Sequence, residues 1–349
     1  MSPFESFLSA LVSRFEDAER ISTLRRRLSF AGRSISLGFS SAALQERLFE
    51  SFEHLEIKAG AAEGDKPAFS IFACDRGALS GRASDWEELE HLASDGERLL
   101  SYNVGPIHAL YNPVGKIFSL ADLASRKGWY CVPSAEDLPF HEIAAPMRMI
   151  LHWSCEGSGS VLVHAAGVGN GSGAVLLAGS GGSGKSTTAM MAVCRGLRYL
   201  GDDYVLLGEA EAPKIYSAYG SLKFRWDAVD RIPEAAALAV NDRAQEKGYC
   251  FLHRAYPEAL SAEGLSLRAV LLPEIARRGE TGISRLPSAK GLLGLAASTI
   301  FQMPGSGATT LKNLASILKG APIYRISLGS DDGHIIGAIH NALAAEGQQ

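Results

Sequence analysis

The sequence predicts an α/β protein with a smaller α+β unit at its N-terminal end. Three observations predict this fold class. Short strand-like and helix-like runs alternate over residues 1–135, two β-type runs joined by a hairpin signal follow, and a glycine-rich segment connects the second of these runs directly to a helix. We therefore expect two domains, residues 1–135 and residues 136–349.

The N-terminal domain is predicted to begin with an amphipathic helix followed by a basic turn at Arg25, Arg26 and Arg27. Apolar side chains recur there at helical spacing: Phe4, Phe7, Leu8, Leu11, Val12 and Phe15. We interpret this segment as a helix packed on its own domain, and the alternative is an interfacial helix in peripheral contact with a membrane. Further along we expect strands at 34–39, 55–59 and 68–74, a helix at 42–52 and a turn-rich connector at 60–66.

The second domain is predicted to follow a helix that begins near Pro139 and runs to Ser154. Residues 161–168 and 174–178 have β-type composition, and the glycine-rich stretch at 169–173 between them favours a hairpin. Later runs predict strands at 265–273 and 322–328 and helices at 289–301, 308–319 and 334–345. A short glycine- and proline-containing stretch at 304–307 suggests a mobile loop over the site.

Composition excludes several classes of protein. The chain has 349 residues and a net charge of -4, so no overall basic field would hold it on nucleic acid, and we expect no nucleic-acid partner. The five cysteines are scattered and never form a C-x-x-C pair, which argues against a disulfide framework or a zinc site. Without a secretory signal pattern or a long apolar run, we expect a cytoplasmic protein.

A phosphate-binding motif follows the second β-type run. Eight consecutive residues match the pattern G-x-x-x-x-G-K-S: Gly179, Ser180, Gly181, Gly182, Ser183, Gly184, Lys185 and Ser186, with Thr187 continuing the segment. Glycines allow successive backbone N–H groups to turn toward a phosphate, and the following helix adds the positive end of its dipole. Lys185 is then placed for the β- and γ-phosphates and the Ser186 hydroxyl for Mg²⁺. The motif therefore predicts binding of ATP with Mg²⁺.

An acidic pair, Asp202 and Asp203, is predicted to return to the phosphates. The helix from Lys185 carries the chain roughly 16 Å away at about 1.5 Å per residue. Six extended residues then cover roughly 20 Å at about 3.3 Å each, which is enough to bring the pair back. Adjacent residues of a strand point to opposite faces, so we expect one carboxylate to hold the metal and the other to take a proton from an incoming hydroxyl.

Three further polar side chains are weaker candidates. His164 is expected on the strand at 161–168, the antiparallel neighbour of the strand that leads into the phosphate-binding motif, where it would point toward the phosphates. The alternative is a satisfied core histidine. Lys223 and Arg225 follow a strand predicted at 215–219 and have the charge to neutralise phosphate. For these two, solvation at the surface is the interpretation we favour.

The segments VHAAG at 163–167, GSGGSGKSTTA and RGLRYLGDDYVLL together resemble the catalytic core of the HPr kinase/phosphorylase family. The resemblance covers about 45 residues, from 162 to 207. It implies a phosphoenolpyruvate-carboxykinase-like P-loop domain in residues 136–349, and an N-terminal domain for acceptor recognition or regulation. It also implies that Asp202 is the catalytic carboxylate, that Asp203 is its metal-side neighbour and that His164 supports Asp202.

The resemblance implies a kinase whose acceptor is a hydroxyl group, with a serine of a small protein or peptide as the leading acceptor. Thr187 stands where the family typically has a glutamate, and the C-terminal glycine-arginine-asparagine loop is not visible, which argues against regulatory phosphorylation of HPr and against the reverse phosphorolysis. A kinase for a small-molecule or lipid alcohol is the alternative. A nucleotide-dependent binding module without transfer is a second alternative, which the acidic pair disfavours.

Overall fold

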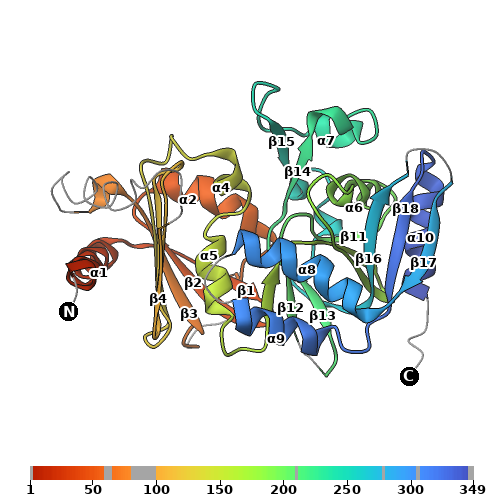
Figure 1. Cartoon of the computed structure of the whole chain (residues 1–349). Coiled ribbons are helices and arrows are strands. Elements are labelled where there is room, and N and C mark those ends of the chain that lie inside the picture. The colour runs from red at the N-terminus through yellow and green to blue at the C-terminus, as the bar shows by residue number, and fades with distance from the viewer. Residues whose placement is uncertain are drawn as a thin grey trace. The chain divides into compact units, whose positions relative to one another are not determined.

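The computed structural model describes residues 3–58, 65–79, 100–208, 211–276, 280–303 and 307–344. It is a mixed α/β protein whose chain forms two compact units (Figure 1). Unit 1 comprises Met1–Ser29, Arg33–Glu50 and Glu56–Ser154, and unit 2 comprises Phe30–Gly32, Ser51–Leu55 and Cys155–Gln349. Most of the predicted connector at 60–66 and of the predicted loop at 304–307 lies outside the described residues.

Unit 1 is built on a mixed sheet whose strands run in the order β1-β2-β3-β7-β6-β5-β4. β2 and β3 are parallel, as are β3 and β7, whereas β4, β5, β6 and β7 form an antiparallel meander. The strands are β1 Leu24–Phe30, β2 Arg33–Phe39, β3 Phe69–Asp75, β4 Leu100–Val104, β5 Ile107–Asn112, β6 Ile117–Asp122 and β7 Lys127–Val132.

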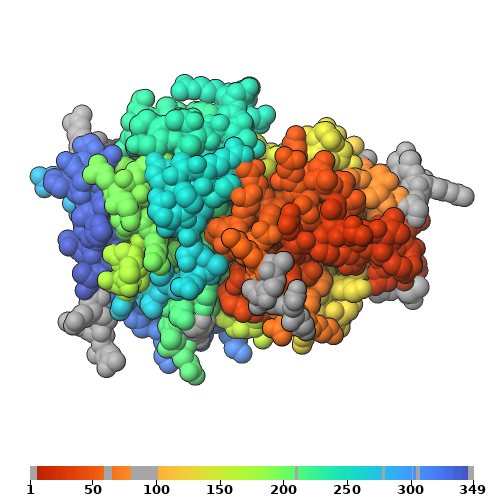
Figure 2. Space-filling view, turned by 180° about the vertical axis from the view of Figure 1, so that it is seen from behind, coloured from red at the N-terminus to blue at the C-terminus, as the bar shows by residue number. Residues whose placement is uncertain are grey.

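The N-terminal helix α1 (Pro3–Ile21) packs on this sheet. Leu8, Leu11 and Phe15 are buried among side chains of β3, β5, β6 and β7, and Phe15 stacks on Trp129 with ring centroids 6.1 Å apart. The predicted packing of this helix on its own domain is therefore confirmed, and its other side forms part of the surface of unit 1 (Figure 2). No helix in the described ranges is both long and apolar enough to cross a membrane.

Several predicted elements of unit 1 differ in the structure. The expected basic turn at 25–27 is part of β1, where Arg26 pairs with Glu56 at 3.3 Å. The helix predicted at 42–52 is α2 (Ala42–Phe49), capped by the Ser41 hydroxyl and continued by a 3₁₀ helix, Glu50–Leu55. The prediction of a strand at 55–59 is wrong for residues 55–58, which the structure describes. Among these residues only Glu56 forms a β-bridge, to Leu28.

The helix predicted from Pro139 to Ser154 is interrupted. It consists of α4 (Phe140–Ala144) and α5 (Arg148–Ser154). Pro146 has no backbone N–H for a helical hydrogen bond, and Met147 adopts a left-handed conformation with φ 57°. The α5 helix packs on β6 and β7 on the face opposite α1, where Gly128 leaves room for Ile150.

Unit 2 is built on a second mixed sheet with the order β11-β9-β10-β16-β13-β12-β8, to which β18 and then β17 are joined beside β16. The β10 strand is parallel to β16, and β16 is parallel to β18. The strands are β8 Val161–Val163, β9 Ala166–Asn170, β10 Gly173–Leu177, β11 Arg198–Gly201, β12 Val205–Gly208, β13 Lys214–Ser217, β16 Leu265–Ile275, β17 Gly282–Leu286 and β18 Ile323–Leu328. A separate pair is formed by β14 Ser221–Arg225 and β15 Lys247–Phe251.

Helices cover both faces of this sheet (Figure 1). Along β10, Val175 and Leu177 face α6 (Lys185–Cys194) and α10 (Asp332–Ala344). Ala174 and Leu176 face α8 (Ser288–Gln302) and α9 (Gly307–Ile317). This alternation is the period of two expected for a strand buried on both faces. The helices predicted at 289–301, 308–319 and 334–345 are thus confirmed, with ends shifted by a few residues. A short helix, α7, spans Pro233–Ala237.

The strand predicted at 161–168 is divided in two. The β8 strand pairs with β12, whereas β9 lies between β11 and β10, so the chain changes its place in the sheet at His164 and Ala165. The His164 backbone N–H donates to the Thr299 hydroxyl at 3.1 Å instead of to a neighbouring strand. The hairpin predicted between β9 and β10 is confirmed, with Asn170 paired to Gly173.

Candidate active site

The glycine-rich segment forms the connection between β10 and α6. Gly179, Gly182 and Gly184 have φ values of 149°, 80° and 101°, which side-chain-bearing residues rarely adopt. A Cβ at Gly184 would lie 2.5 Å from Leu328, whereas a Cβ at Gly182 would meet nothing within 4 Å. The loop therefore needs glycine for its conformation, and its Gly182 side is open to a ligand.

Lys185 is the first residue of α6, and its side chain folds back on the loop. The ammonium donates to the carbonyl oxygens of Gly179 at 2.7 Å and of Ser180 at 3.0 Å. Burial lowers the pKa of Lys185, and the charges of Asp203 and Asp202 oppose that effect. A bound phosphate would compete with these two carbonyl oxygens for the ammonium group.

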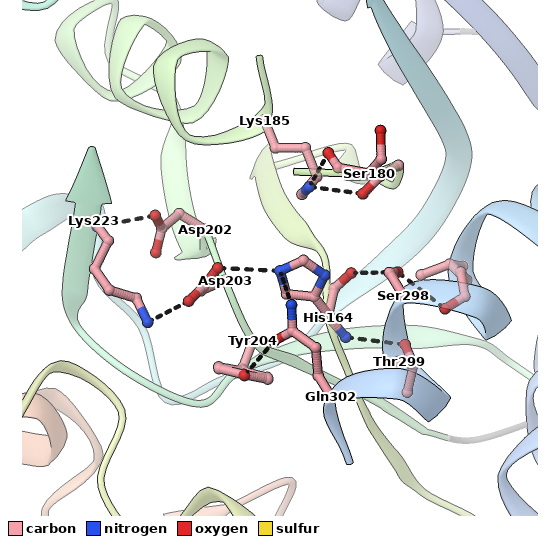
Figure 3. A network of polar contacts seen from close by, with 12 residues as sticks. His164, Ser180, Lys185, Asp202, Asp203, Tyr204, Lys223, Ser298, Thr299 and Gln302 are labelled. Atoms are coloured by element: carbon pink, nitrogen blue, oxygen red, sulfur yellow. Dashed lines mark hydrogen bonds and ion pairs between the residues drawn. The ribbon is translucent and has the colours of Figure 1, made fainter. Parts of the chain in front are cut away.

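The acidic pair lies beyond the end of β11, in a bend before β12. The prediction that both residues lie within a strand is therefore wrong, although the predicted return of the chain to the glycine-rich segment is confirmed by the contact between Ser186 and Asp202. Figure 3 shows Lys185, Asp202, Asp203 and His164 gathered around one space.

Asp202 is buried, with 3% of its surface exposed. Its carboxylate accepts from the Tyr199 hydroxyl at 3.1 Å and from the Lys223 backbone N–H at 3.0 Å, and it is hydrogen-bonded to the Ser186 side chain. Burial and the charge of Asp203 raise the pKa of Asp202 to about 7, and Lys223 and Ser186 limit the rise. This carboxyl group is thus poised to exchange a proton near neutral pH.

Asp203 has the opposite electrostatic environment. Burial raises its pKa, but the charge of Lys223 and the contact with His164 outweigh burial, and the pKa of Asp203 is well below its usual value. One carboxylate oxygen contacts His164 Nε2 at 3.2 Å, and the other forms an ion pair with the Lys223 ammonium. Two adjacent carboxylates with pKa values moved in opposite directions form the kind of pair that divides acid–base roles.

His164 is buried between this pair and the C-terminal end of α8. Its Nε2 lies 3.2 Å from Asp203 and 3.3 Å from the amide nitrogen of Gln302, and its ring packs against Tyr204. The Tyr204 hydroxyl donates to Gln302 at 2.7 Å. The resemblance implied that His164 supports Asp202, whereas in the structure it contacts Asp203. His164 is buried and hydrogen-bonded, as the alternative of a core histidine expected, and its partner is a carboxylate of the acidic pair.

Lys223 is part of the candidate site, which the sequence did not lead us to expect. Its side chain is 12% exposed, and it contacts Asp202 through its backbone and Asp203 through its ammonium (Figure 3). The favoured interpretation as a solvated surface cation is therefore wrong for Lys223. It is correct for Arg225, whose side chain is 60% exposed and paired with Asp227. Lys223 and Arg225 are two residues apart in β14, so strand alternation places them on the same face and does not distinguish the buried cation from the exposed one. The neighbouring strand β15, which pairs with β14, was not predicted.

Oxygen ligands for a hard cation are present. Within the described ranges, no group of three or more His, Cys, Asp and Glu side chains is arranged to hold a metal ion. The Ser186 hydroxyl and the two carboxylates are nevertheless the ligand types that Mg²⁺ prefers, and Mg²⁺ in nucleotide sites completes its shell with phosphate oxygens and water. The buried Ser183 hydroxyl, which has no hydrogen-bond partner, is a further polar group left for a ligand of the loop. These residues fit a nucleotide-bound Mg²⁺.

Comparison with known proteins gives limited similarity. No family model and no curated protein matches the chain. Among solved structures, the chain is similar to the HPr(Ser) kinase/phosphatase from Coxiella burnetii, with 12% identity and a TM-score of 0.30. The match covers 52% of this chain and 94% of that chain. At this level of similarity the roles of individual residues rest on the geometry of the site.

Proposed function

We propose that this protein is an ATP- and Mg²⁺-dependent kinase that transfers the γ-phosphoryl group to a hydroxyl acceptor, with a serine of a small protein or peptide as the leading acceptor. One observation carries the proposal: Lys185 of the phosphate-binding motif faces the same space as the two carboxylates of the acidic pair, and their charges act on its ammonium group (Figure 3). A phosphate-binding loop beside two carboxylates whose pKa values are shifted in opposite directions brings together the parts that phosphoryl transfer requires.

The loop and Lys185 bind the triphosphate in this proposal. Backbone N–H groups around Gly182 and the N-terminal end of α6 attract the phosphates. Lys185 exchanges its contacts with the Gly179 and Ser180 carbonyl oxygens for the β- and γ-phosphates. Ser186 and Asp203 would hold Mg²⁺, which would neutralise charge on the phosphate oxygens.

Asp202 accepts the proton in the transfer step. The acceptor oxygen forms a bond to the γ-phosphorus, the bond from that phosphorus to the β–γ bridging oxygen breaks, and ADP leaves with that oxygen. The acceptor's hydroxyl proton moves to the Asp202 carboxylate. A pKa of about 7 suits this role, because a general base works best when its pKa lies near the operating pH.

Asp203 remains ionised through the same step. Lys223 and His164 each contact one of its oxygens, and these contacts fix the carboxylate next to Asp202. The Asp203 carboxylate thus stays negatively charged where it would bind the metal ion. Replacing each aspartate by asparagine separates the two roles. We expect Asp202→Asn to stop transfer with ATP still bound, and Asp203→Asn to raise the Mg²⁺ concentration required for half-maximal rate.

The acceptor class is tested by incubating the protein with γ-labelled ATP and Mg²⁺ and either a peptide fraction or a lipid extract. The proposal predicts label in the peptide fraction as phosphoserine, absent when Asp202→Asn replaces the wild-type protein. Label confined to the lipid extract would assign a lipid alcohol as acceptor. Bound nucleotide with no label in either fraction would make the protein a binding module and refute the proposal.

A further inference from the structure

A short segment from the N-terminal part of the chain belongs to unit 2. Ser51–Leu55 lies within unit 2, although the residues on both sides of it, ending at Glu50 and resuming at Glu56, belong to unit 1. Ser51, Phe52 and Leu55 are 0 to 1% exposed. We name this segment the strap. By its contacts the strap is therefore part of unit 2.

The strap contacts the connection between β13 and β14. The Gly220 backbone N–H donates to the Ser51 carbonyl oxygen at 2.7 Å, and His54 Nε2 shares a 2.7 Å hydrogen bond with the Ser217 hydroxyl. The Phe52 ring packs on Tyr219 with centroids 5.3 Å apart. Backbone, polar and aromatic contacts therefore all bind the strap to residues 217–220.

Those residues lead directly into the candidate active site. Ser221 follows Gly220, and its carbonyl oxygen accepts from the Tyr199 hydroxyl, which also donates to Asp202. Two residues later, Lys223 contacts both carboxylates. Tyr219 also packs edge-on against Tyr204, whose ring contacts His164. A shift of residues 217–220 would therefore move groups on both sides of the acidic pair.

We infer that Phe52 and His54 are positioning residues for phosphoryl transfer: through Ser217, Tyr219 and Gly220 they hold Lys223 in place against the two carboxylates. The inference rests on the proposed function for its catalytic consequence. Neither side chain touches the carboxylates, so both act through residues 217–223. A displacement of about 1 Å in such a support can lower a rate by about 100-fold.

His54 acts as a neutral hydrogen-bonding group. Burial and the neighbouring His253 lower the pKa of His54 to about 3, so it carries no charge at neutral pH. The His253 ring is in turn paired with Glu53 at 3.1 Å. Gly220 faces the other ring nitrogen, and a Cβ at residue 220 would lie 3.0 Å from His54 Nδ1. The role of His54 is therefore to form a hydrogen bond with Ser217 as an uncharged side chain.

The experiment compares full-length variants. His54→Leu removes the hydrogen bond to Ser217, His54→Gln restores a polar group near Nε2, and Phe52→Leu removes the aromatic contact. Leu343→Ala, at a buried position of α10 in the same unit, is the control for a general loss of packing. For each variant, we would measure kcat, the ATP–Mg²⁺ dissociation constant and amide hydrogen exchange of residues 217–224.

We expect His54→Leu and Phe52→Leu to lower kcat by about 10- to 100-fold while the ATP–Mg²⁺ dissociation constant stays within about threefold. Amide hydrogen exchange at Gly220 and Lys223 should be faster in these two variants than in the wild type. His54→Gln should retain most of the wild-type kcat. Leu343→Ala should change neither kcat nor exchange at Gly220 and Lys223. Unchanged exchange at Gly220 and Lys223 in both strap variants would overturn the inference, even if kcat fell. Absence of transfer in the wild type would instead refute the proposed function. The exchange rates at Gly220 and Lys223 would still show whether the strap holds residues 217–223 in place.

Discussion

Lys223→Met should destabilise unit 2 in a pH-dependent way. The substitution keeps most of the apolar stem and removes the charge that neutralises Asp203. The Lys223 backbone N–H remains available to Asp202. The substitution therefore removes the ion pair. It leaves Asp203 beside a second carboxylate and in contact with His164.

The size of the effect follows from burial. Removing one partner of a buried ion pair typically costs about 3–5 kcal/mol, because the other charge stays unpaired. Asp203 is 28% exposed and retains His164, so we expect a loss of about 2–3 kcal/mol near neutral pH. In the wild type the pKa of Asp203 is depressed below its ordinary 3.8, which stabilises the fold above that pH. In the variant, burial raises this pKa without the opposing charge of Lys223, so the loss of stability should shrink as acid protonates Asp203.

Urea unfolding of both proteins from about pH 8 down to pH 4 measures this difference. The control is Lys127→Met, which removes a cation that is 39% exposed and paired with Glu16, and it should cost less than about 1 kcal/mol at every pH. A loss in Lys223→Met no larger than in the control, or one that does not change with pH, would refute the assignment of Lys223 as the partner of a buried carboxylate.

Three other predictions concern the nucleotide, the strap and a surface cation. Lys185→Ala should weaken ATP–Mg²⁺ binding in calorimetry while the protein stays folded, and unchanged affinity would contradict the loop assignment. His54 is neutral in the folded state, so its contribution to the unfolding free energy should fall by up to about 2 kcal/mol between pH 7 and pH 5 as the unfolded state gains a proton, and the difference between wild type and His54→Gln should change by that amount over this range. Arg225→Ala should leave transfer within about twofold of wild type, since its side chain is paired in solvent with Asp227.

The elements predicted correctly from the sequence are those that depend on residues close together in the chain. The glycine-rich motif between a strand and a helix, the hairpin at 169–173 and the helices at the C-terminal end follow from turn chemistry and periodicity. The return of Asp202 to the motif followed from the lengths of one helix and one strand. These inferences needed only neighbouring residues.

Features that depend on distant contacts were not predictable in this way. The division of one apolar run at His164 depends on a hydrogen bond to Thr299, 135 residues away. The pairing of His164 with Asp203 instead of Asp202 depends on where the bend after β11 places each carboxylate. The strap gave no sequence signal. Its residues 51–55 lie across the end of the helix predicted at 42–52 and the start of the strand predicted at 55–59, and their partners at 217–220 are far along the chain.

The decisive measurement is the rate of γ-phosphoryl transfer to a peptide fraction by wild-type protein and by Asp202→Asn, with ATP–Mg²⁺ affinity measured on the same samples. If Asp202 is the base of a serine kinase, the wild type forms phosphoserine and the variant is slower by about 10²- to 10⁴-fold at similar nucleotide affinity. A variant within about threefold of the wild-type rate, or a wild type that binds ATP–Mg²⁺ and transfers nothing, would contradict this assignment.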